Sequence, residues 1–118
     1  MKKPFLSVLI TTYNRKNLLL QAIKSIQNQN FDDYEIIISD DGSNDGTNEL
    51  CKDLCQKDKR IFYTKNTRYK KGPNGNKNNA LDNARGEFVM FLDDDDELLE
   101  NAINTLVAKV RGGGTRTF

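Results

Sequence analysis

The stretch FVMFLDDDD, residues 88–96, sets five apolar residues directly before four aspartates. A short apolar run with a polar end is typical of a buried strand in a parallel sheet, and its wholly apolar make-up indicates a central position in that sheet. Upstream, YEIIISDDGS at residues 34–43 repeats the arrangement, because its isoleucine triplet leads to Asp40 and Asp41. Two predicted strands therefore end in carboxylates.

Segments of helical spacing separate these strands from two further ones. Strands are predicted at residues 5–10, 34–39, 61–64 and 88–92, and helices at about 15–29, 47–56, 76–85 and 98–110. We expect Asn14 to cap the first helix, Gly86 to end the third, and Leu99 to lie on the buried face of the last. The alternation predicts an α/β, Rossmann-like fold with a mostly parallel four-stranded sheet flanked by helices. Residues 1–111 are expected to form one domain and residues 112–118 a flexible tail.

Composition narrows the classes of partner. Lysine and arginine total 18 and aspartate and glutamate 17, so the net charge of +1 predicts no nucleic-acid partner. Cys51 and Cys55 are the only cysteines and stand four positions apart in a predicted helix, which favours two reduced thiols. The apolar run at residues 5–10 is too short for a signal peptide or a membrane span. These features predict a cytoplasmic location, with the inner face of the membrane as a second possibility.

The aspartates concentrate where an open α/β sheet binds its ligands, beyond the carboxyl ends of the strands. Like charges this close repel one another unless a cation compensates. Carboxylates without histidine or thiolate favour Mg²⁺ or Mn²⁺, and such a site is completed by water and a substrate phosphate. The alternative is that the aspartates of residues 93–96 only cap the helix that follows, where negative charge is favoured.

Other ligand motifs fit less well. Asp41 begins a partial calcium-loop pattern, but Lys52 stands where the pattern needs glutamate. In addition, the segment before Asp41 is a predicted strand, whereas a calcium loop follows a helix. The glycine-rich fingerprints for dinucleotides and for nucleoside triphosphates are absent from the sequence. The loop at residues 66–75 and its flanks are basic, and this surface is interpreted first as solvated and second as a phosphate clamp. Its basic residues are Lys65, Arg68, Lys70 and Lys71.

Three segments in order, SVLITTYNR (7–15), EIIISDDGSNDGT (35–47) and GEFVMFLDDDD (86–96), closely resemble the family 2 glycosyltransferases. The resemblance covers about residues 5–110. It implies the GT-A fold, of which this chain would be the first half, the part that binds the nucleotide of a sugar donor.

The resemblance also implies roles for individual residues. Thr12 and Tyr13 would line the base pocket, with Tyr13 stacking on the base, and Asp41 would accept a hydrogen bond from it. Residues 93–95 match the family's Asp-x-Asp motif, in which Asp95 would bind the metal, Asp93 the ribose or the metal, and Asp94 would lie near the nucleotide. Lys77 stands where the family usually has arginine, which keeps the charge without the guanidinium fork.

The implied reaction is metal-dependent transfer of a sugar from a nucleoside diphosphate, most simply UDP, to a hydroxyl of a glycan or lipid-linked acceptor. The family usually inverts configuration, and the general base is expected beyond residue 118. We therefore predict weak donor binding and poor transfer by this chain alone. The alternatives are a non-catalytic nucleotide-binding fragment and a metal-dependent nucleotidyltransferase. Peripheral membrane association and a homodimer formed through uncovered apolar surface are further possibilities.

Overall fold

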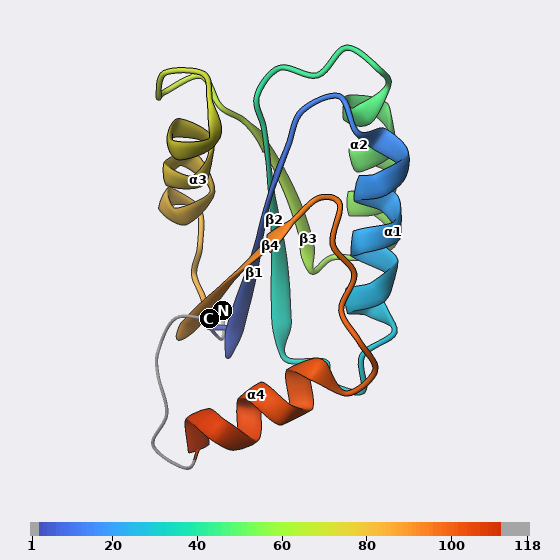
Figure 1. Cartoon of the computed structure of the whole chain (residues 1–118), viewed down its shortest axis with the longest axis vertical. Helices are drawn as coiled ribbons and strands as arrows, with labels where there is room; N and C mark the ends of the chain where they lie inside the picture. Colours follow the sequence, from blue (N-terminus) through green and yellow to red (C-terminus); the bar gives the residue numbers. More distant parts are fainter. Residues whose placement is uncertain (1–2, 112–118) are drawn as a thin grey trace.

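The computed structural model describes residues 3–111, which form one sheet and its covering helices (Figure 1). The elements in chain order are β1 (Leu6–Thr12), α1 (Lys16–Gln27), β2 (Tyr34–Asp40), α2 (Thr47–Lys57), β3 (Ile61–Lys65), α3 (Pro73–Asp82), β4 (Phe88–Asp93) and α4 (Ala102–Arg111). The predicted α/β class is confirmed. The flexible tail expected at residues 112–118 lies outside the described residues.

The four strands are all parallel and follow the spatial order β3-β2-β1-β4. Within residues 3–111, β4 pairs only with β1 and lies at the edge of the sheet, so the expectation that residues 88–92 form a central strand is wrong. Its apolar composition has another cause. Met90 and Leu92 pack into the core on one face of the sheet, and Val89 and Phe91 pack on the other. An apolar run thus reports that both faces of a strand are covered, and not its place in the strand order.

Helices cover both faces of the sheet (Figure 1). On one side α1 and α2 pack against the strands, and α4 adds Ile103 and Val107 to the same core near the amino ends of the strands. On the other side α3 forms a smaller core, in which Ala80 meets Leu9 and Ile37. The carboxyl ends of the strands are therefore left to the loops.

Several helix ends differ from the predictions. Asn14 does not cap α1: Arg15 is the N-cap residue, and Asn14 has a left-handed φ of 53° with its side-chain oxygen accepting from the backbone N–H of Asn44. Helix α3 begins at Pro73, because proline suits a first helical turn, and ends at Asp82, so Gly86 is not its final residue. Leu99 is 82% exposed and precedes α4.

Gly86 has a different structural reason. Its backbone N–H donates to the hydroxyl of Ser7 at 2.7 Å, and a Cβ at this position would lie only 2.5 Å from that oxygen. Ser7 in turn donates to the fully buried Glu35 at 2.6 Å, which also accepts from Arg85. This network holds the start of β4 against β1 and β2.

Both cysteines are free thiols. Burial raises the pKa of Cys51 to about 12 and also raises the pKa of Cys55, so both stay protonated and apolar in the core around α2. Among the described residues, no helix combines the length and the apolar character that crossing a bilayer requires.

Candidate functional site

The carboxyl ends of β1, β2 and β4 and the start of α3 surround a pocket of about 490 Å³. Parallel strands place their following loops at one edge of the sheet, so residues far apart in sequence meet there. All the site residues expected from the sequence line this pocket: Thr12, Tyr13, Asp41, Lys77, Asp93, Asp94 and Asp95. Further lining residues had no predicted role, and two of them, Arg15 and Asn76, are polar and hydrogen-bonded.

The acidic segment at the carboxyl end of β4, residues 93–96, contains two kinds of carboxylate. Asp93, Asp95 and Asp96 are exposed, and each offers an oxygen within 4.8 Å of those of the other two. Three hard oxygen donors at this spacing suit a magnesium- or manganese-like ion. The same residues form a turn well ahead of α4, which starts at Ala102, so the helix-capping alternative does not explain them.

Asp94 points the other way, into the protein. It is 7% exposed, and one carboxylate oxygen accepts from the hydroxyl of Thr12 at 2.9 Å. Burial raises the pKa of Asp94, whereas the Thr12 hydrogen bond and the charge of Arg15 lower it. Asp94 therefore joins the ends of β4 and β1 beneath the pocket, and touches the pocket only as part of its wall.

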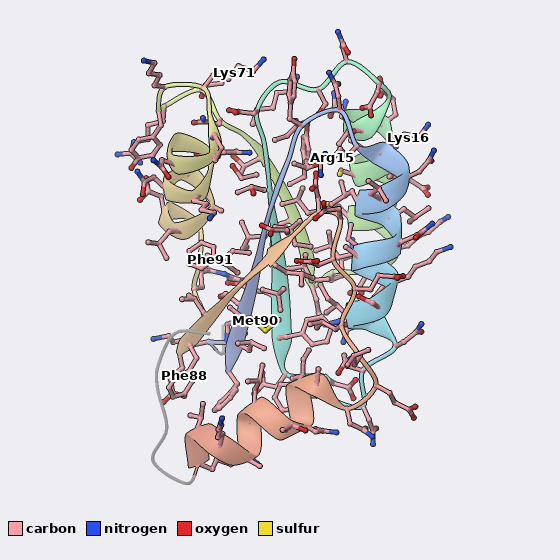
Figure 2. All side chains as sticks on the ribbon, in the orientation of Figure 1. Arg15, Lys16, Lys71, Phe88, Met90 and Phe91 are labelled. Carbon is pink, nitrogen blue, oxygen red and sulfur yellow. The ribbon has the colours of Figure 1, made fainter. Side chains whose placement is uncertain are left out.

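Arg15 is the cation nearest to these acids. Its Nη1 lies 3.1 Å from Asp95 and 3.5 Å from Asp94, and its side chain is 49% exposed. Figure 2 shows Arg15 beside the carboxyl end of β4 and Lys16 farther out along α1. Sequence reasoning missed Arg15, although the residue ends the SVLITTYNR segment, because its partners lie 79 and 80 positions away.

The two acids at the end of β2 have separate tasks. Asp40 is fully buried and accepts from the backbone of Ser43 at 3.0 Å and from Tyr63 at 2.5 Å, which holds the following loop. Burial and this hydrogen bond raise the pKa of Tyr63. Asp41 faces the pocket, where its oxygens accept from Asn66 and from the N–H of Gly72. Only Asp41 of this pair belongs to the candidate site.

Asp45, a later residue of the partial calcium-loop pattern, forms hydrogen bonds close to the start of α2. Asp45 accepts from the hydroxyl and N–H of Thr47 and from the N–H of Lys16. The Thr47 hydrogen bond is the main cause that lowers the pKa of Asp45. These contacts fix the entry to α2.

The basic loop contributes one of its basic residues to the pocket. Lys71 lies with its Nζ 3.8 Å from the centre of the Tyr13 ring, a cation–π contact, and both residues line the pocket. Arg68 instead pairs with Asp82 at 3.2 Å on the surface. Lys65, Arg68 and Lys70 are exposed and do not line the pocket, so the clamp interpretation is open for Lys71 alone.

Buried amides support the floor of the pocket. Ser39 donates to Asn76 at 2.6 Å, Asn79 donates to Ser39 at 2.8 Å, and the Asn76 amide reaches the carbonyl of Thr12 at 3.4 Å. This network fixes α3 to the ends of β1 and β2. A helix rich in asparagine gives no sequence signal for which amides are buried.

The parallel sheet, with its carboxylate-lined pocket at the strand ends, matches solved glycosyltransferases of the GT-A fold. The description "Glycosyl transferase family 2" belongs to the family profile that matches residues 7–117, so the chain is a member of that family. The resemblance seen in the three sequence segments is confirmed.

Similar proteins agree with this assignment. A Campylobacter jejuni protein named GalNAc(5)-diNAcBac-PP-undecaprenol beta-1,3-glucosyltransferase is 57% identical over 115 residues, which cover 98% of this chain and 37% of that one. The structure of Staphylococcus aureus TarS 1-349 in complex with UDP-GlcNAc superposes with a TM-score of 0.82 at 27% identity, covering 92% of this chain and 31% of that one.

A mannosyltransferase from Pyrobaculum calidifontis, solved with GDP-Man and Mn²⁺, superposes with a TM-score of 0.77 at 24% identity. The match covers 94% of this chain and 32% of that one, and at this identity it supports the fold alone. The chain thus spans about a third of the length of these proteins.

Proposed function

We propose that this chain is the donor-binding half of a metal-dependent glycosyltransferase that transfers a sugar from UDP to an acceptor hydroxyl with inversion of configuration. The observation that carries the proposal is the single pocket that places an aromatic ring and Asp41 at one part of its wall and the carboxylates of Asp93 and Asp95 at another. A nucleoside diphosphate has the matching parts, a base and a charged diphosphate.

The base would bind near Tyr13, Thr12 and Asp41. The Tyr13 ring is 44% exposed and so offers surface for stacking. Each Asp41 oxygen already accepts one hydrogen bond, and a carboxylate oxygen has a second lone pair for a donor such as the N3–H of uracil. Lys71 covers part of the Tyr13 ring and would have to move or share it.

The diphosphate would bind near the acidic cluster and Lys77. Asp93 and Asp95, with Asp96 beside them, would hold Mn²⁺ or Mg²⁺, because three exposed carboxylates within 4.8 Å fit a hard divalent cation. Such an ion supplies charge neutralisation for the departing diphosphate. Lys77 lines the same pocket and adds a point charge in place of the arginine usual in the family.

The acceptor and the remaining chemistry are proposed from the relatives. The name of the Campylobacter jejuni protein specifies an undecaprenol-linked glycan, which supports a lipid-linked acceptor. We propose with it a peripheral attachment at the cytoplasmic face of a membrane. The TarS complex supports a UDP-sugar donor. Because these relatives are about three times as long, we place the general base beyond residue 118. The homodimer stays a prediction.

Calorimetric titration of UDP tests the donor site, with GDP as the comparison and with Mn²⁺ or EDTA present. We expect UDP to bind only with Mn²⁺ and Asp95→Ala to abolish binding. Asp53→Ala is the matched control, because Asp53 is an exposed carboxylate on α2 that pairs with Lys57 and does not line the candidate pocket. Binding without metal would favour a non-catalytic nucleotide module, and no binding by the folded chain would contradict the proposed site.

A further inference from the structure

Arg15 donates to one of the carboxylates that would hold the metal. Its guanidinium donates to Asp95 at 3.1 Å, and Asp95 is one of the three carboxylates whose oxygens converge. The arginine guanidinium and a divalent ion are both cations, and both bind the lone pairs of a carboxylate. If both contacted Asp95, two positive charges would also stand a few ångströms apart, where they repel.

We propose that Arg15 is an internal counter-cation that holds Asp95 while the metal is absent, releases it when the metal binds, and then turns its guanidinium to the diphosphate. The proposal rests on the proposed function, and assigns to Arg15 a donor-binding role that couples metal binding to donor binding.

The geometry allows this exchange without disturbing the fold. The Arg15 side chain is 49% exposed, so it can change rotamer without leaving a cavity, and it lies at the start of α1 on the wall of the pocket. Its longer contact with Asp94, at 3.5 Å, keeps the guanidinium near the site after Asp95 is released. Asp94 itself is anchored by Thr12 and stays in place.

The charge balance favours the same sequence of events. Without metal, four consecutive aspartates repel one another, and Arg15 offsets part of that repulsion. With metal bound, the cluster no longer needs Arg15, while the incoming diphosphate brings new negative charge to the pocket. A planar guanidinium suits phosphate oxygens because it donates two parallel hydrogen bonds.

The test is titration of Mn²⁺ alone, followed by UDP at saturating Mn²⁺, on the wild-type chain and on Arg15→Met. The Mn²⁺ affinity is followed by the loss of the free-ion electron paramagnetic resonance signal. We expect Arg15→Met to bind Mn²⁺ about two- to fivefold more tightly, since an exposed ion pair no longer competes. We expect the same variant to bind UDP about tenfold more weakly, as the loss of one charge-assisted hydrogen bond predicts.

Lys16→Met is the matched control, because it removes the same charge from the next residue, outside the contacts of the acidic cluster. We expect it to leave both affinities unchanged. Arg15→Gln serves as a second variant if Arg15→Met melts before the titration temperature, and circular dichroism checks the fold of each.

The outcomes separate this inference from the proposed function. If the wild-type chain binds UDP with Mn²⁺ but Arg15→Met binds Mn²⁺ equally or less tightly, Arg15 is a structural contact and the exchange is refuted. An equal gain in Mn²⁺ affinity for Lys16→Met would show that the effect comes from net charge alone, and this result would also refute the exchange. If the wild-type chain binds no Mn²⁺, both proposals fail together.

Discussion

The hydroxyl of Thr12 donates to the buried carboxylate of Asp94 at 2.9 Å, across 82 positions of sequence. This contact joins the carboxyl ends of β1 and β4 directly under the candidate site. Because Asp94 is 7% exposed, water cannot easily replace a lost partner.

Replacing Thr12 by valine removes this hydrogen bond and keeps the side-chain shape. We expect Thr12→Val to lower the free energy of unfolding by about 1 to 3 kcal/mol, because it leaves a buried charged acceptor without that donor. Urea unfolding followed by circular dichroism measures the change. Thr67→Val, on an exposed loop, is the control and should change stability by less than about 0.5 kcal/mol. A neutral Thr12→Val would mean that Arg15 alone satisfies Asp94.

The Tyr13 ring gives a second prediction about the nucleotide base. We expect Tyr13→Phe to keep UDP affinity near the wild-type value, because stacking needs only the ring, and Tyr13→Ala to weaken it about tenfold. Calorimetry with UDP and Mn²⁺ measures both. The pair is internally controlled, since it separates the ring from the hydroxyl. Equal losses in the two variants would show that the hydroxyl, and not stacking, binds the ligand.

A third prediction concerns acid stability away from the site. Hydrogen bonds from Arg60 are the main cause that lowers the pKa of Asp58 to about 2. A carboxyl with a lowered folded-state pKa stabilises the fold above its unfolded pKa near 4, and this contribution disappears as pH falls toward 2. We expect Asp58→Asn to cost about 1 to 2 kcal/mol at pH 7 and progressively less between pH 4 and 2.

Unfolding in urea at several pH values checks this dependence. Asp53→Asn is the control, because the Asp53–Lys57 pair on α2 is well exposed and contributes little. A stability difference for Asp58→Asn that does not change with pH would contradict the role of the ionised carboxyl.

The strand positions were largely predictable, because each buried run is bounded by polar residues. Residues 34–39 and 88–92 became β2 and β4, each one residue longer than predicted. The edge position of β4 was not predictable, since coverage of both faces gives the same apolar run in an edge strand as in a central one. The prediction that Leu99 lies on the buried face of the last helix was wrong, because Asn101, with its left-handed backbone, interrupts the helical period just before α4.

The site divides in the same way. Its acids were predictable from their place after two strands, and the pocket does bring the expected residues together. The sequence did not allow a prediction of which of these acids are buried and which face the pocket. Asp40 is buried and Asp41 faces the pocket because successive residues at a strand end point to opposite sides. The pairing of Arg15 with Asp95 depends on tertiary structure, which a local pattern does not contain.

The pairing of β1 with β4 also bears on how the chain folds. In this sheet each residue of β1 that pairs with β4 meets a residue 82 positions later in the sequence. Such distant pairings slow folding, because a long loop must close first. During synthesis, one edge of β1 therefore stays open until residue 93 has left the ribosome. The candidate pocket needs both of these strand ends as well as residues after β2 and on α3, so it is complete only after β4 has paired with β1. Under the proposed function, the appearance of nucleotide binding would therefore report this pairing.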